Sequence, residues 1–185
     1  MDSLRIDGFE TGDFAAVWAA NDRAPVSTES SATGAAVIWG DAIPGPGSER
    51  LDAPGLVREW QSQRSVPPPF DGFYAALLYD TMQGLTAGCD LLGFFPLYYA
   101  VSSDALLIGA SPELFRHHRQ FPAGLSPEGL TGILLTHAVF EGRSILSGVR
   151  RLRPGHILKW QAGADPVELV QYTIPATPRA DQSSF

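Results

Sequence analysis

Short apolar runs between residues 70 and 115 are separated by glycine, aspartate and serine. The runs cover residues 73–79, 85–87, 96–101 and 106–110. Runs of this kind, bounded by turn-forming residues, predict β-strands and hairpins. Most of them lack the alternation of polar and apolar residues that a half-exposed strand shows. We therefore predict a sheet that is covered on both of its faces.

The pattern predicts one strand and one helix before this central region. Residues 34–39 are predicted as a strand, and the Pro/Gly-rich residues 41–48 as an irregular loop. Residues 52–64 are predicted as a helix, with Asp52 as its N-cap and Pro54 in its first turn. Its apolar stripe consists of Leu51, Leu56, Val57 and Trp60.

A second helix and a hairpin are predicted after the central region. Ser126 is placed to cap a helix whose first position is Pro127. The apolar face of this helix would consist of Leu130, Ile133, Leu134 and Val139. A β-hairpin near residues 149–160 would close the domain. The apolar residues 14–20 do not by themselves distinguish a strand from a helix.

Composition narrows the class of protein. The chain has 185 residues, 44% of them hydrophobic, which suits one packed domain. A net charge of −7 argues against a surface for nucleic acid or an anionic membrane. No apolar run approaches the ~20 residues that span a bilayer, and the acidic N-terminal segment lacks the parts of a signal peptide. The single cysteine, Cys89, excludes an internal disulfide and favours the cytoplasm.

Five phrases follow one another in a characteristic order. They are residues 70–80 (FDGFYAALLYD), 89–99 (CDLLGFFPLYY), 110–114 (ASPEL), 148–156 (GVRRLRPGH) and 171–175 (QYTIP). This order resembles the N-terminal glutaminase-type domain, a class II glutamine amidotransferase, of asparagine synthetases. The corresponding family phrases are L-x-G-x-F-A-F-x-L-Y-D, R-D-R-L-G-I-K-P-L-Y-Y, A-S-x-L, G-V-x-x-L-P-P-G-H and Y-W-x-x-P. The resemblance extends from about residue 70 to residue 175.

The resemblance implies an α+β fold, namely a four-layer αββα sandwich of antiparallel sheets, as in N-terminal-nucleophile hydrolases. Residues 1–175 are expected to form the domain, although residues 1–33 do not match the family. The polar residues 176–185 are predicted to be a tail or the stump of a linker.

The nucleophile of the resembled family is absent. Family members use an N-terminal cysteine whose thiolate attacks the glutamine carboxamide, with the free α-amine as base. Here Met1 is followed by Asp2 and Ser3. Ser3 is a weak candidate, since it would have to be exposed by cleavage after Asp2. Cys89 lies in a predicted strand, where a small buried residue is the expected role.

Four residues are candidate remnants of the glutamine pocket. Trp39, Gly40 and Asp41 lie where the family has an Asn-Gly-Glu turn, and the tryptophan replaces a side-chain amide that would stabilise an oxyanion. Asp90 matches the aspartate of the family's Arg-Asp-Arg. Both arginines and the lysine of that phrase are replaced here, by Cys89, Leu91 and Phe95. A pocket filled by packing is one interpretation of these changes, and a pocket altered for an apolar ligand is the other.

Metal and cofactor motifs are not evident. His117 and His118 are adjacent and would point in different directions on a strand or helix, so they are not expected to share a metal. His137 and His156 are isolated in the sequence. The sequence contains no phosphate-binding glycine motif and no nucleophile elbow. We therefore predict neither a metal nor a cofactor.

The main functional hypothesis is a domain without glutaminase activity that scaffolds an ATP-dependent, amide-forming synthetase domain. That partner, an ATP-pyrophosphatase-type domain, would act in trans or belong to a longer product, and a homodimer is compatible with this role. Cysteine-less domains of this type occur in β-lactam synthetases and lasso-peptide cyclases, in which no free ammonia is needed. Two alternatives stay open. One is a divergent amidohydrolase that uses Ser3 or an Asp41/Asp90 pair, and the other is a module that binds a small amino-acid-like molecule.

Overall fold

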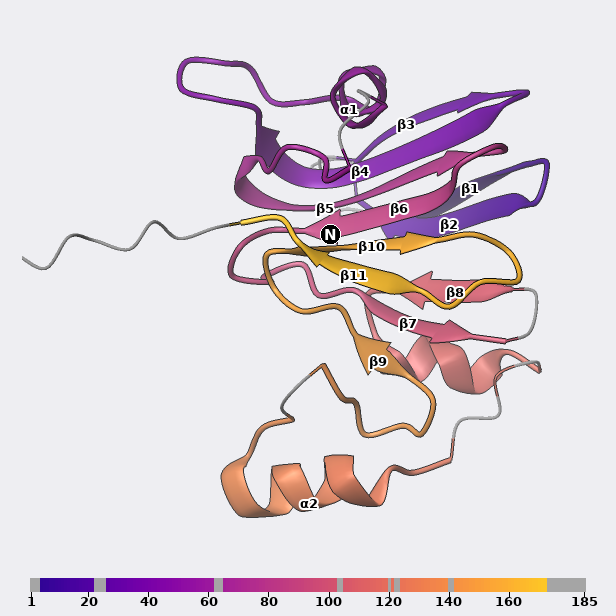
Figure 1. The fold of residues 1–185 in the computed structure, drawn as a ribbon, viewed down its shortest axis with the longest axis vertical. Helices are drawn as coiled ribbons and strands as arrows, with labels where there is room; N and C mark the ends of the chain where they lie inside the picture. The colour runs from indigo at the N-terminus through magenta and orange to yellow at the C-terminus, as the bar shows by residue number, and fades with distance from the viewer. Residues whose placement is uncertain are drawn as a thin grey trace, which may run out of the picture.

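The computed structural model describes residues 4–21, 26–61, 65–102, 105–119, 121, 124–139 and 142–172. Strands dominate the fold, and helices lie at its margins (Figure 1). The strands are β1 (Arg5–Thr11), β2 (Phe14–Ala20), β3 (Val26–Ser31), β4 (Gly34–Ile43), β5 (Asp71–Asp80), β6 (Gly84–Cys89), β7 (Tyr98–Val101), β8 (Leu106–Gly109), β9 (Arg150–Arg151), β10 (His156–Trp160) and β11 (Val167–Val170). The helices are α1 (Ala53–Trp60), the 3₁₀ helix η1 (Pro112–His117) and α2 (Pro127–Thr136).

A six-stranded antiparallel sheet forms the centre of the molecule, in the order β11-β10-β6-β5-β4-β3. Its two longest strands, β4 and β5, pair from Gly34↔Asp80 to Ile43↔Asp71. Alternate residues of these strands enter two different cores. Ile38 and Ala76 pack on one face, whereas Val37 and Leu77 pack on the other. The prediction of a sheet covered on both faces is therefore confirmed.

Helix α1 covers one face of this sheet. Asp52 caps the helix as predicted, because its Oδ1 accepts a hydrogen bond of 2.8 Å from the Gly55 amide. Leu56 and Trp60 point into the core, and the Trp60 ring stacks on Phe70. The helix ends at Trp60, earlier than predicted, and residues 62–64 lie outside the described part of the chain.

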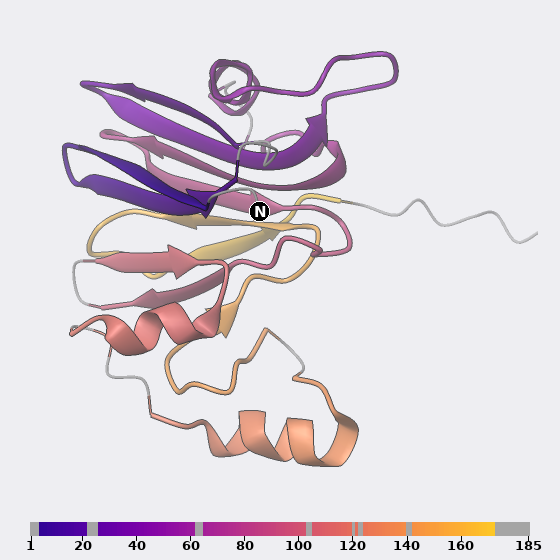
Figure 2. The same cartoon turned by 180° about the vertical axis from the view of Figure 1, so that it is seen from behind.

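Two small sheets cover the opposite face. The hairpin β1–β2 packs its aromatic residues against the core, and the Phe14 ring stacks on Tyr79 at 5.3 Å. The ambiguous residues 14–20 are thus a strand. The sheet β8-β7-β9 adds Tyr99 to the same core, and η1 lies on its outer side, where Phe115 is buried (Figure 2).

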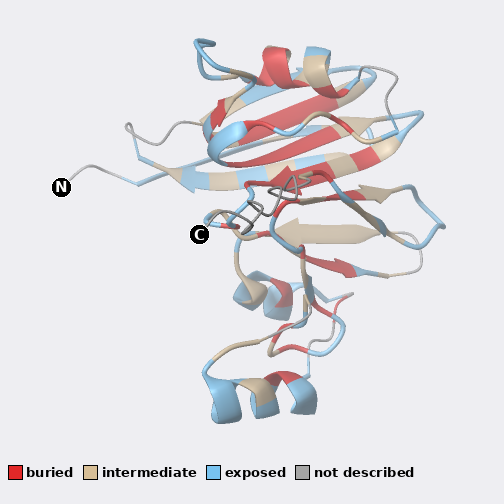
Figure 3. Ribbon diagram, turned by 60° about the vertical axis from the view of Figure 1, so that its left-hand side comes forward, coloured by how far each residue is buried: buried red, intermediate tan, exposed pale blue. Residues whose placement is uncertain are grey.

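Three predictions are wrong. Residues 149–160 do not form a hairpin, because β9 pairs with β7 whereas β10 pairs with β6 and β11. Residues 41–43 are not irregular, because β4 continues through them alongside β5. The expected apolar face of α2 is not buried: Leu134 is 80% exposed, and among the helix residues only Gly129 is buried (Figure 3). Within the described residues, no helix is long and apolar enough to cross a membrane.

Candidate functional site

The four predicted pocket residues gather at one end of the six-stranded sheet. Gly40 lies opposite Tyr74 in the β4–β5 register, and the amide of Asp90 donates to the Tyr74 carbonyl at 3.0 Å from the other side of β5. Trp39 and Asp41 flank Gly40 on β4. Residues that are distant in the sequence therefore lie at the same end of this sheet. Ser3 lies outside the described residues.

Gly40 is required by the backbone at this position. Its φ is 87°, and a Cβ atom on it would lie 2.1 Å from the Phe73 carbonyl oxygen. An L-residue would be strained by the dihedral angle and would also collide with the neighbouring strand. Residues 39–41 thus form no turn here but lie within β4, where the backbone geometry requires a glycine at position 40.

Asp90 holds a loop together. It is 1% exposed, and its carboxylate accepts hydrogen bonds from the amides of Leu92 (3.0 Å), Phe94 (3.2 Å) and Phe95 (3.2 Å). Its carbonyl oxygen also accepts from the amides of Gly93 and Gly155. Backbone amides satisfy a buried carboxylate well, because charge-assisted hydrogen bonds offset the cost of removing it from water. The carboxylate is therefore occupied by the chain itself.

Asp41 differs from Asp90 in its surroundings. Its side chain is 64% exposed and lies 3.4 Å from the guanidinium of Arg50, which is 53% exposed. An ion pair in this setting contributes little to stability because water and salt screen it. The Asp90 carboxylate thus binds backbone amides in the interior, whereas the Asp41 carboxylate pairs with an arginine at the surface.

Aromatic side chains occupy the same end of the sheet. Trp39 and Phe95 are partly buried against the core between the sheets. Phe73 and Phe94 contact each other edge to face, with ring centroids 4.9 Å apart. An indole ring at position 39 and a phenyl ring at position 95 therefore pack on the core at this end of the sheet.

Cys89 cannot serve as a thiolate at neutral pH. The residue is fully buried at the end of β6, and its Sγ lies 4.0 Å from the Arg153 carbonyl oxygen. Burial, followed by the negative charge of Asp90, raises the pKa of the thiol to about 12. The predicted role as a small buried residue is confirmed.

A polar cluster between the sheets was not predicted from the sequence. Glu168 on β11 accepts from the Tyr99 hydroxyl at 2.7 Å and from the Arg153 guanidinium at 2.8 Å. Burial, with a contribution from Glu168, raises the pKa of Tyr99 to about 12. The only signal in the sequence is a glutamate between apolar residues in a short strand. The cluster ties three distant segments together and has the character of a structural network.

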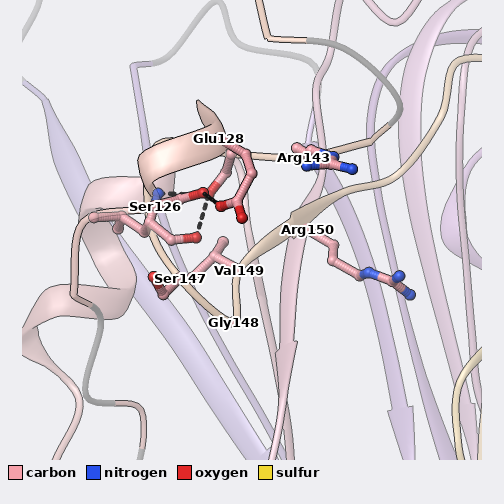
Figure 4. Close-up of a pocket in the computed structure, with 9 residues that line it drawn as sticks. Ser126, Glu128, Arg143, Ser147, Gly148, Val149 and Arg150 are labelled. Carbon is pink, nitrogen blue, oxygen red and sulfur yellow. Dashed lines mark hydrogen bonds between the residues drawn. The ribbon is translucent and has the colours of Figure 1, made fainter. Parts of the chain in front are cut away.

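A hollow of about 350 Å³ lies beside the start of α2 (Figure 4). It is lined by Ser126, Glu128, Arg143, Ser144, Leu146, Ser147, Gly148, Val149 and Arg150. Its serines are used by the fold: the Ser126 hydroxyl caps the Gly129 amide and contacts Glu128, and Ser147 donates to the Leu125 carbonyl. Hydrogen bonds from its own amide and from Ser126 lower the pKa of Glu128. The polar atoms at this helix start thus serve capping.

No metal-binding cluster of three or more histidine, cysteine or acidic residues occurs in the part of the chain that the structure describes. His117 and His118 lie at the end of η1, where the His118 ring contacts Phe121.

The central sheet, with Gly40 on β4 and the Asp90 loop at one of its ends, defines a domain of antiparallel sheets. Comparison with protein families identifies the class: residues 56–173 match the family described as glutamine amidotransferase domain. Because this match covers more than half of the chain, the protein belongs to that family. A search of curated proteins gives no match.

Proposed function

We propose that this glutamine amidotransferase domain does not hydrolyse glutamine and that it scaffolds an ATP-dependent, amide-forming synthetase domain of the asparagine synthetase type. The observation that carries the proposal is the state of Cys89. It is the only cysteine of the sequence, and it is buried with a raised pKa. Thiol-based glutamine hydrolysis needs an accessible thiolate, and Cys89 does not supply one at neutral pH.

The surroundings of the pocket residues support a filled pocket. Trp39 and Phe95 pack on the core, and three backbone amides occupy the Asp90 carboxylate. A glutamine would have to displace these contacts before it met Asp90. We therefore prefer a filled pocket to one altered for an apolar ligand.

The order of the helical and sheet layers supports a four-layer αββα sandwich. Helix α1, the six-stranded sheet, the two small sheets and η1 follow one another (Figures 1 and 2). This sequence of helix, sheet, sheet and helix is the one expected of a four-layer αββα sandwich, with the outer helical layers reduced. A sequence with a single cysteine is typical of a reducing compartment such as the cytoplasm, where disulfides are rare.

Two measurements test the proposed absence of glutamine hydrolysis. A thiol reagent should label Cys89 in denaturant and leave it unlabelled in the native protein. Glutamine should leave the melting temperature unchanged, because only a ligand of the native state raises it. Rapid native labelling, together with a melting temperature that rises with glutamine concentration, would contradict the proposal.

The scaffolding role has its own test. A synthetase domain encoded beside this chain should co-purify with it, and it should form its amide product more slowly when the chain is absent. A synthetase domain that is equally stable and active alone would refute the scaffolding role without restoring glutaminase activity.

A further inference from the structure

Gln171 and Tyr172, the last two residues that the structure describes, lie at the end of the six-stranded sheet where β10 begins. Their backbone amides both donate to the Gly155 carbonyl, at 3.0 Å and 3.2 Å. Gln171 is buried, and the Tyr172 ring lies so close to Gly155 that a Cβ atom there would be 3.3 Å from its Cδ2. This two-residue segment, which we call the exit clamp, is therefore held by hydrogen bonds and by packing.

The exit clamp also binds the segment that joins α1 to β5. Residues 67–69 are prolines, which have no amide hydrogen to donate. Gln171 Nε2 donates to the carbonyls of the first two, at 3.3 Å and 2.9 Å, and the Tyr172 hydroxyl donates to the Phe70 carbonyl. The buried Phe70 ring stacks on Trp60 of α1. The clamp thus fixes a segment that cannot form a strand ladder of its own.

Two further contacts connect the clamp with β5 and with the loop around Asp90. The single hydroxyl hydrogen of Tyr172 goes to the Phe70 carbonyl, so the hydroxyl of the buried Tyr74, 3.3 Å away, donates to the Tyr172 oxygen. Gly155 accepts the two clamp amides at its carbonyl and donates its own amide to the Asp90 carbonyl at 3.2 Å. Hydrogen bonds therefore run without a break from the clamp to the Asp90 loop.

We propose that the exit clamp, residues 67–70 and the loop of residues 90–95 open together as one unit while the centre of the sheet stays folded. Local units of this kind open at a lower free energy than the whole domain. A displacement of Tyr172 breaks both hydrogen bonds of its hydroxyl and, through Gly155, removes a support of the loop. A molecule that draws the chain away at Tyr172 would thereby loosen this end of the sheet without touching Asp90. This inference does not depend on the proposed function.

Amide hydrogen exchange, followed by NMR for each residue, tests the shared opening in the wild-type chain. The amides of Phe95, Gly155 and Tyr172 report on the unit, and the amide of Ala87, at the centre of β6, reports on the sheet. After correction for intrinsic rates, the first three should share one protection factor that is lower than that of Ala87. Their exchange should also depend only weakly on urea, because a partial opening exposes little surface.

Two variants separate local opening from global unfolding. Tyr172→Phe keeps the ring and removes two hydrogen bonds, so exchange at Phe95 and Gly155 should become faster by roughly tenfold or more. Val37→Ala is the matched variant outside the unit, because Val37 is buried in the core that stays intact during the local opening. It should accelerate exchange at Ala87 by about tenfold and leave Phe95 and Gly155 unchanged.

Three outcomes would overturn the proposal. In the first, the three reporters of the unit differ in protection by more than about tenfold in the wild-type chain. In the second, Tyr172→Phe folds and leaves exchange at Phe95 and Gly155 unchanged. In the third, Val37→Ala accelerates all four amides equally, which would show that the unit opens only when the whole domain unfolds. The first and third outcomes can be read even if Tyr172→Phe does not fold.

Discussion

Asp90 provides a direct test of whether the pocket remnant is part of the fold. Asp90→Ala removes the acceptor of three backbone hydrogen bonds, from Leu92, Phe94 and Phe95. Asp90→Asn keeps one oxygen and turns the other acceptor into a donor. Asp90→Ala therefore removes all three of these hydrogen bonds, whereas Asp90→Asn removes only part of them.

The expected cost follows from these contacts. A hydrogen bond to a charged group contributes about 1.5–3 kcal/mol. The sum over three such hydrogen bonds does not apply, because Leu92 and Phe94 are residues of an exposed loop, each 65% exposed, so that water can replace part of the lost hydrogen bonding. We expect Asp90→Ala to lower the free energy of unfolding by about 3 kcal/mol and Asp90→Asn by about 1.5 kcal/mol. Such a loss is a large fraction of the stability of an ordinary domain.

Urea unfolding followed by tryptophan fluorescence measures this cost. Asp80→Ala is the matched control, because the Asp80 carboxylate also accepts two backbone amides, from Met82 and Gln83, but in an exposed turn. We expect it to cost about 1 kcal/mol or less. If Asp90→Ala lost less than about 0.5 kcal/mol, or no more than Asp80→Ala, the carboxylate would not be holding the loop and the reasoning would fail.

Three further predictions concern single residues. Gly40→Ala should cost at least about 2 kcal/mol in urea unfolding, because its Cβ would collide with the Phe73 carbonyl at a φ of 87°; a wild-type midpoint would contradict this. The pKa of the Cys89 thiol is raised from 9.0 to about 12 in the fold, so the free energy of unfolding should fall between these pH values by roughly 1.4 kcal/mol per pH unit. The fall should be smaller in Cys89→Ala, and an equal dependence on pH in both proteins would refute the raised pKa. Ser126→Ala should cost about 1 kcal/mol through loss of the cap on Gly129, and an unchanged melting temperature would contradict the capping role.

Local features of the fold could be predicted from the sequence because their causes are local. Asp52 and Ser126 cap α1 and α2 with their own side chains, and a proline follows within the first two positions of each helix. The uninterrupted apolar run in β5 indicated burial on both faces, and the two cores of the central sheet account for it.

Features that depend on distant partners could not be predicted. Residues 149–160 resemble a hairpin, but β9 finds its partner in β7, about 50 positions earlier, and β10 in β6. The apolar face of α2 was expected to be buried because an amphipathic pattern implies a partner, although it does not say which molecule supplies the partner. In the structure Leu134 is exposed.

The structure shows where the four candidate residues lie, and their contacts could not be predicted from the sequence. The motif order indicated that Trp39, Gly40, Asp41 and Asp90 come together, and the registers around β5 gather them at one sheet end. The sequence alone does not reveal that the 91–95 loop folds around the Asp90 carboxylate, because this depends on backbone geometry. Burial of Cys89 was predictable from its place in a strand, whereas its raised pKa also reflects the charge of Asp90.

Glutamate release from glutamine tests the central claim most directly. The purified chain would be incubated with glutamine at neutral pH, with Cys89→Ala in parallel and an active glutaminase as positive control. We predict that neither protein releases glutamate above the rate of buffer alone, since the only thiol of the sequence is buried and protonated. Release by the wild type that disappears in Cys89→Ala would show a working thiol nucleophile. Release that persists in Cys89→Ala would show another one, and either result would contradict the account.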